Sequence, residues 1–170
     1  MHRRLVFYAR TVAFQRFVSM STTTKSIASV LNSLIETCRD GQEGFRSAAE
    51  NVKSADFKSL FSELSMQRQQ FIGELQTLVR SLAEDTEKTG SIAGALHRGW
   101  IDLKAALTSG DEHAILSECE RGEDSAVAEY REALEHEDLP ADVRSVIRQQ
   151  YMGVQAAHDR VRDLRDRFQG

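Results

Sequence analysis

Apolar residues recur every three or four positions through most of this chain, and that spacing limits the fold more than any other feature. The first run passes through Ile27, Leu31, Leu34, Cys38, Gly41, Phe45, Ala48 and Val52. The second passes through Phe57, Phe61, Leu64, Arg68, Phe71, Leu75, Leu78 and Leu82. A 3.5-residue period kept over about four heptads predicts long helices packed at a shallow angle. Because only residues 54–56 separate the runs, we expect an antiparallel hairpin.

A second hairpin is predicted in the C-terminal half. One helix is lined by Leu116, Cys119, Glu123, Ala126, Tyr130 and Ala133. The next is lined by Val143, Ile147, Gln150, Val154, Ala157, Val161, Leu164 and Phe168. Pro140 suits the first turn of that last helix, where its missing N–H has no cost.

Between the hairpins, residues 92–108 predict a short crossover helix. Ser91 can cap its start, Gly110 can end it, and Asp111 can cap the next helix. Hairpin, crossover and hairpin is the connectivity of a ferritin-like bundle. The predicted fold is therefore all-α: a ferritin-like four-helix bundle over residues 26–170, with a short crossover helix between two antiparallel hairpins.

Residues 1–25 are set apart from this fold as a disordered, extension-like or targeting-like segment. The first nineteen are Arg-rich, aromatic and free of acids, and their uncharged runs are too short for a membrane span. One interpretation is a targeting peptide of mitochondrial type. The other, which we favour, is an upstream extension before a natural start at Met20, so residues 1–19 need not occur in the mature protein.

The distribution of charge excludes a nucleic-acid partner for the folded part. All 26 acidic residues lie after residue 35, together with 17 of the 22 basic ones, which gives a formal charge of −9. Such a surface repels phosphate backbones. The two cysteines, Cys38 and Cys119, fall on apolar helix faces and indicate reduced core thiols in a cytoplasmic protein. No membrane partner is expected.

Polar residues near the middle of both hairpins predict a buried layer. If the first hairpin turns near residues 54–55, Gly41 faces Arg68, and Glu43 lies level with Gln67. An inward arginine needs a carboxylate partner, and Glu43 is a nearby acid in the predicted hairpin. We therefore expect a buried network of Glu43, Gln67, Arg68 and Gln155. The glycines beside these acids, among them Gly44 and Gly122, are expected to make room for it.

The same level of the predicted bundle also allows a metal site. Ferritin-like carboxylate proteins use a Glu from each of two helices and Glu-x-x-His from the other two. The candidate ligands are Glu43, Glu120, Glu123 and His158, with iron or another divalent metal as the cofactor. Methionine and glutamine stand where two further ligands belong, at positions 66 and 155, and Arg68 adds a positive charge. We favour the structural network, with no cofactor and no catalytic residue.

The crossover contains the single tryptophan of the chain, Trp100, within HRGW. We interpret it as the anchor of the short helix, with Gly99 allowing close approach. No nucleophile elbow, phosphate-binding glycine loop, CxxC or HExxH motif is present.

Four motifs in order carry a family resemblance. They are LNSLIETCRDGQEGFRSAAE, GALHRGWIDLKAAL, CERGEDSAVAEYREAL and AAHDRVRDLRD. The chain resembles, over about residues 26–168, an uncharacterised bacterial family of ferritin-like four-helix-bundle proteins, known as a domain of unknown function. The resemblance implies a ferritin-like fold and a bacterial, cytoplasmic setting, without an established activity.

Two functional hypotheses follow. The leading one is a non-enzymatic, stress-associated bundle that forms a homo-oligomer and uses its polar layer for structure. The alternative is a metal-binding oxidoreductase or metal-handling protein that uses the same layer. The protein partner, if any, is not indicated by the sequence.

Overall fold

The computed structural model describes the backbone of residues 3–84, 100 and 102–168, and the side chains of residues 27–82, 100 and 102–168. Its regular elements are five helices, and the described residues contain no strand. The helices are α1 (Arg3–Asn51), α2 (Ala55–Glu84), α3 (Leu103–Ser109), α4 (Glu112–Glu135) and α5 (Ala141–Arg167). The all-α prediction is confirmed.

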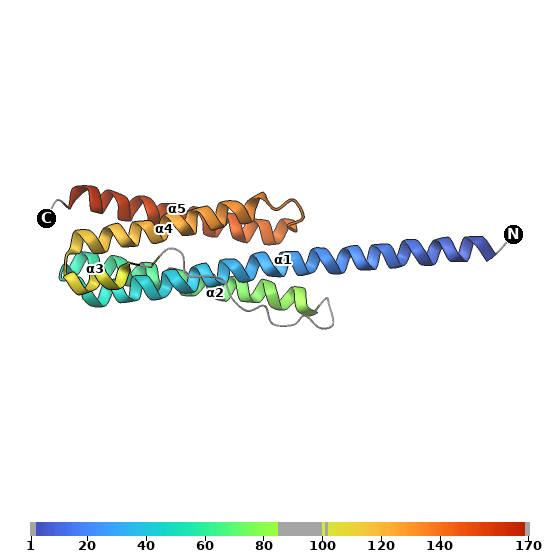
Figure 1. Ribbon diagram of the computed structural model, residues 1–170, viewed down its shortest axis with the longest axis horizontal. Coiled ribbons are helices and arrows are strands. Elements are labelled where there is room, and N and C mark those ends of the chain that lie inside the picture. The colour runs from blue at the N-terminus through green and yellow to red at the C-terminus, as the bar shows by residue number, and fades with distance from the viewer. Residues whose placement is uncertain (1–2, 85–99, 101, 169–170) are drawn as a thin grey trace.

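The four long helices lie side by side. Helix α1 packs against α2 and α4, and α5 packs against α4 and α2. Each long helix therefore has two of the other long helices as neighbours. Figure 1 shows α1 and α2 running in opposite directions, as do α4 and α5, so both predicted hairpins are present. Helices α2 and α4 run in the same direction, and α3 lies at the end where α4 begins. None of the described helices is both long and apolar enough to cross a membrane.

The N-terminal boundary differs from the prediction. The apolar spacing placed the start of the first helix near residue 27, but α1 begins at Arg3 and continues through residue 26 without a break. Figure 1 shows this first part of α1 extending beyond the other helices. Most of the predicted crossover helix (92–108), together with its expected cap Ser91, lies outside the described residues. The described part ends in α3, which runs from Leu103 to Ser109.

Short polar contacts fix the helix ends near the α1–α2 turn. Gly110 has a φ of +67° and ends α3, as the sequence predicted. Asp111 accepts a hydrogen bond from the His113 N–H at 3.0 Å and caps α4. One carboxylate oxygen of Glu112 accepts the backbone N–H groups of Lys53 and Ser54, at 2.6 and 2.8 Å. The start of α4 therefore holds the turn between α1 and α2.

The connection between α4 and α5 is held by hydrogen bonds from Arg144 of α5. Pro140 occupies the cap position of α5, one residue before the first turn. Arg144 donates to the carbonyl oxygen of Leu134 at 2.7 Å and to that of His136 at 2.6 Å. These carbonyls at the end of α4 have no partner within the helix, so a guanidinium satisfies them and also complements the negative end of the helix dipole.

Replacing Arg144 with alanine should lower the free energy of unfolding by about 1.5–3 kcal/mol, the usual range for hydrogen bonds to a charged group. The measurement is urea unfolding followed by circular dichroism. Arg131→Ala, at an exposed position of α4, is the matched control and should change the stability by less than about 0.5 kcal/mol. Equal effects of the two variants would show that Arg144 does not hold the connection.

The apolar core is divided into two clusters along the helices. One contains Leu34, Leu75 and Ile147, and the other contains Phe45, Phe61 and Leu116. On α2, α4 and α5 the change from one cluster to the other falls near the middle of the helix, and on α1 it falls between Cys38 and Phe45. The buried Arg68 and Glu123 lie at this level. The centre of the molecule is therefore a polar layer between two apolar halves.

Candidate functional site

The polar layer is built on a buried ion pair between α2 and α4. The Nη2 atom of Arg68 lies 2.7 Å from Oε1 and 2.5 Å from Oε2 of Glu123. Both side chains are only 1% exposed. The apolar spacing of the sequence placed each of them inward, and this prediction is confirmed. The pairing itself, which joins the two hairpins, was not predicted.

The surroundings of Arg68 explain how a buried guanidinium is accommodated. Gly41 of α1 packs against the Arg68 side chain, and a Cβ built there would be in van der Waals contact with Arg68 Cγ at 3.4 Å. The guanidinium carbon lies 5.9 Å from the ring centre of Phe45 and 5.6 Å from that of Phe71, within the range of cation–π contacts. Nη1 donates to the Gln67 side chain at 2.9 Å. The guanidinium is thus enclosed by aromatic rings and a polar oxygen.

Burial and pairing act in opposite directions on the two ionisable groups. Burial raises the pKa of Glu123 above its usual range, although the adjacent Arg68 opposes this shift. Burial also acts to lower the pKa of Arg68, but the Glu123 carboxylate outweighs it and the pKa is raised. Each charge is retained in the core because the other is beside it.

A second set of hydrogen-bonded side chains lies next to the ion pair and links all four long helices. The Cys38 thiol lies 3.1 Å from the Tyr130 hydroxyl, which donates to Gln150 Oε1 at 2.8 Å. Gln150 Nε2 donates to Glu74 at 2.8 Å and to the Phe71 carbonyl at 3.3 Å. Gln150 is completely buried. Its inward position in the apolar repeat was a signal in the sequence, but Gln150 was not proposed as part of the polar layer.

The buried Cys38 predicts a loss of stability at alkaline pH. Burial raises the pKa of its thiol from 9.0 to about 11. The unfolded chain therefore releases this proton near pH 9 while the folded chain still holds it. The stability contributed by the group is complete below pH 9 and falls as the pH rises towards 11. At about 1.4 kcal/mol per unit of pKa shift, the loss by pH 11 should be about 2 kcal/mol.

The measurement is chemical unfolding of the wild type and of Cys38→Ala at a series of pH values. Between pH 9 and 11 the free energy of unfolding should fall more steeply for the wild type than for the variant. Parallel slopes would contradict the assignment. The comparison is specific because Tyr130 and Cys119, whose pKa values burial also raises, remain in both proteins.

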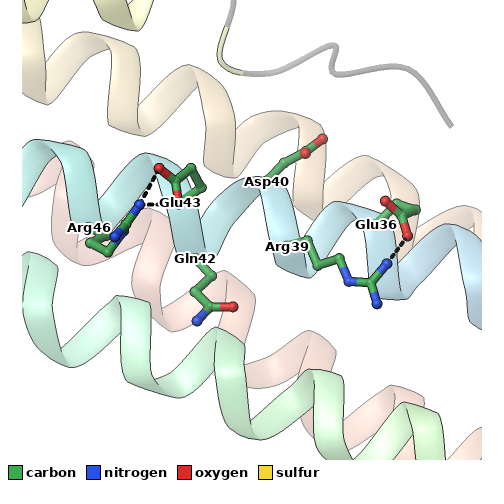
Figure 2. Close-up of a pocket in the computed structure, with 6 residues that line it drawn as sticks. All are labelled: Glu36, Arg39, Asp40, Gln42, Glu43 and Arg46. Carbon is green, nitrogen blue, oxygen red and sulfur yellow. Dashed lines mark hydrogen bonds and ion pairs between the residues drawn. The ribbon is translucent and has the colours of Figure 1, made fainter.

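Glu43 does not take part in the polar layer, and the prediction that it pairs with Arg68 is wrong. Its side chain is 63% exposed and binds Arg46 of the same helix at 2.6 Å. Figure 2 shows Glu43 paired with Arg46 on α1, where both line a pocket together with Glu36, Arg39, Asp40 and Gln42. Glu43 is two residues from the inward Gly41, a rotation of about 200° around a helix, and its side chain therefore points outward.

The other predicted members of the site are dispersed. Glu120 is buried but pairs with Arg165 of α5. His158 is 18% exposed and lies 2.9 Å from Asp124 at the α4–α5 surface. Gln155 is exposed, which corrects its assignment to the buried network, because it follows the inward Val154 by only one position. Gln67, by contrast, does contact Arg68 as described above.

The candidate metal ligands therefore do not converge. Of the four, only Glu123 lies in the central layer, and its two oxygens face Arg68. Within the described residues, no group of three or more His, Cys, Asp or Glu side chains is placed to hold a metal ion. The side chains that do meet in the layer are those of Arg68, Glu123 and Gln67. The opposite charges of Arg68 and Glu123 neutralise each other.

Two glycines expected beside the polar layer have another role. A Cβ built on Gly44 of α1 would lie 2.3 Å from Trp100 Cε3, and one built on Gly122 of α4 would lie 2.4 Å from Trp100 Cε2. The indole also meets the Phe45 ring edge-on, with centres 5.2 Å apart. Trp100 therefore occupies a slot between α1 and α4, in agreement with its predicted role as the anchor of the crossover. Gly99, expected to assist it, lies outside the described residues.

Comparison with known families places these features in a wider group. Residues 26–136 match the family described as domain of unknown function DUF2383. The chain belongs to this family. The DUF2383 region includes Arg68, Glu123 and Trp100, so the buried pair and the tryptophan slot both lie within it. Helix α5, which supplies Gln150, lies beyond the matched residues. Comparison with curated proteins finds no match.

Proposed function

We propose that this member of the DUF2383 family is a non-enzymatic helical protein with a ferritin-like fold that acts through self-association. The parallel direction of α2 and α4, each within its own antiparallel pair, supports the ferritin-like connectivity. The buried and unpaired thiols of Cys38 and Cys119 support a reducing, cytoplasmic setting in a bacterium. A role under stress is part of the same proposal.

The observation that carries the non-enzymatic part of the proposal is the ion pair of Arg68 with Glu123. Ferritin-like carboxylate proteins direct inward acids at mid-bundle to a pair of metal ions. Here the inward acid directs both oxygens to a guanidinium at 2.7 and 2.5 Å. A dication beside Arg68 would meet a positive charge in a medium of low polarity, where like charges repel strongly. The layer therefore serves packing and register rather than metal chemistry.

The test combines metal binding with measurement of the assembly. The purified full chain is incubated with Fe(II), Mn(II) or Zn(II), and bound metal, thermal stability and molar mass are measured. We expect less than one equivalent of bound metal, no thermal shift and a mass above that of one chain. Stoichiometric metal that is lost in Glu120→Ala or His158→Ala, but kept in the exposed control Glu43→Ala, would overturn the proposal. A monomer at all concentrations would refute self-association.

A further inference from the structure

One long surface of the molecule has no charged side chain at its centre. Helix α5 carries no charged residue from Gln149 to Ala157, and α2 carries only the buried Arg68 between Met66 and Gly73. The two stretches lie at the same level, because a Cβ built on Gly153 would lie 2.9 Å from the Phe71 ring. In a chain with 28% charged residues, neutral stretches in register on neighbouring helices are unusual.

Exposed neutral side chains form the centre of this surface, which we call the α2–α5 face. It comprises Met66, Gln70, Gly73, Gln149, Met152 and Ala156, all exposed. Met66 and Met152, at 64% and 65%, are the large apolar side chains that stand exposed in the described part of the chain. Methionine side chains adapt their shape to a partner, so two of them on an otherwise neutral surface suit it to a protein contact.

The opposite surface carries the described part of the connection between the hairpins. Trp100 lies in its slot between Gly44 and Gly122, and α3 packs on α4 and α1. Because each long helix has two neighbours, the α1–α4 side is the reverse of the α2–α5 side. The connection between the hairpins thus lies, where it is described, away from the α2–α5 face.

Charged residues at the two ends of the face have a regular arrangement. On α2 both ends are acidic, Glu63 and Glu74. On α5 the ends carry Arg148 and Arg160, and the exposed Asp159 stands beside Arg160 and pairs with Arg162 at 3.1 Å. Arg160 and Glu63 lie level, with Nη1 3.0 Å from Oε1. Glu74 accepts a hydrogen bond from Gln150 at 2.8 Å, and Arg148 lies two residues before Gln150 on α5. The α2 side of the face therefore has an acid at each end, and the α5 side has an arginine at the same height at one end and at a similar height at the other.

We propose that the α2–α5 face binds a second copy of this chain, with α2 of each copy against α5 of the other about a two-fold axis parallel to the helices. This inference rests on the proposed self-association and names its surface. In that orientation Glu63 meets Arg160 of the partner subunit, and Glu74 meets Arg148 of the partner subunit. The neutral centres then meet without like-charge repulsion, and glutamine amides can both donate and accept hydrogen bonds.

The charge pattern also selects this orientation over the other face-to-face arrangement. A two-fold axis perpendicular to the helices would place α2 against α2 and α5 against α5. Glu63 would then oppose the Glu74 of the second copy, and Arg148 would oppose the Arg160 of that copy. Like charges placed opposite each other in an interface disfavour it. Only the parallel axis gives opposite charges at both ends.

The first test is the concentration dependence of molar mass, measured by sedimentation for the full chain and two lysine variants. Met152→Lys places a charge at the centre of the face and should raise the dimer dissociation constant about 30-fold or more, as expected for a buried interface position. Ala128→Lys adds the same charge at an exposed position of α4 and should leave the constant unchanged. If the wild type dimerises and Met152→Lys dimerises equally well, the face is wrong and self-association stands. A monomeric wild type refutes both.

The second test determines orientation by cross-linking. A chain carrying Met66→Cys is mixed with a chain of different mass carrying Ala156→Cys, and the mixture is oxidised. The native thiols of Cys38 and Cys119 are buried and should not interfere. The proposed axis predicts the mixed disulfide as the main product. Predominant cross-linking of Met66→Cys chains to one another would overturn the orientation.

Discussion

Replacing Glu123 with alanine should lower the free energy of unfolding by about 3–5 kcal/mol, the largest effect expected of any exchange in the central layer. The substitution leaves the Arg68 guanidinium charged, 1% exposed and without its carboxylate. Removing one partner of a buried pair destabilises the protein strongly, because the remaining charge is desolvated and no opposite charge offsets that cost. The measurement is chemical unfolding followed by circular dichroism.

A double variant separates the cost of an unpaired charge from the value of the pair. Arg68→Met combined with Glu123→Leu removes both charges and keeps apolar volume, and should be close to the wild type in stability or above it. Glu43→Ala is the control at a comparable height on the exposed face of α1, and should change the stability by less than about 0.5 kcal/mol. A Glu123→Ala effect as small as that of Glu43→Ala would show that the pair is not buried.

Substituting alanine for Gly44 should displace Trp100 and destabilise the protein by about 1–3 kcal/mol, the usual cost of overpacking. The added Cβ would lie 2.3–2.6 Å from three atoms of the rigid indole, so the ring must move. The gain of about 1 kcal/mol in helix propensity opposes this cost but does not cancel it. Because Trp100 is the single tryptophan, its fluorescence reports the displacement directly, with a shift to longer wavelength.

Gly73 provides the matched control for this substitution. It lies in α2, and a Cβ built on it has no atom within 4 Å. At protein concentrations where the chain is monomeric and the α2–α5 face is free, Gly73→Ala should therefore stabilise the protein by about 1 kcal/mol through helix propensity and leave the emission unchanged. The two glycine variants should thus shift the stability in opposite directions. Stabilisation of both would show that Trp100 does not occupy the slot.

The sequence predicted the helices well because their burial repeats at a fixed period. Runs of apolar residues at 3.5-residue spacing placed both hairpins, and Gly110 and Asp111 marked the start of α4 within a residue. The extension of α1 to Arg3 was missed for a physical reason. An apolar repeat records packing against neighbours, and Figure 1 shows that this part of α1 runs beyond the other helices.

The site was predicted only within one hairpin. Short turns fix the relative height of two adjacent helices, so the approach of Gly41 to Arg68 could be derived from sequence. The partner of Arg68 could not, because Glu123 belongs to the other hairpin and its height depends on the long connection between them. Glu43 was chosen on height alone, without regard to which side of α1 it occupies. Trp100 was recognised as an anchor. Its slot between α1 and α4 could not be predicted, because the relative height of these two helices depends on the same long connection.

The division of the core into two apolar halves has a consequence for how the molecule fluctuates. A continuous apolar core transmits the loss of packing along its whole length, whereas a polar layer interrupts it. The half around Phe61 and Leu116 contains the Glu112 link to the α1–α2 turn. The half around Leu34 and Ile147 ends at the α4–α5 connection. Each half can therefore open as a cooperative unit of its own, with amide exchange in one while the other remains protected.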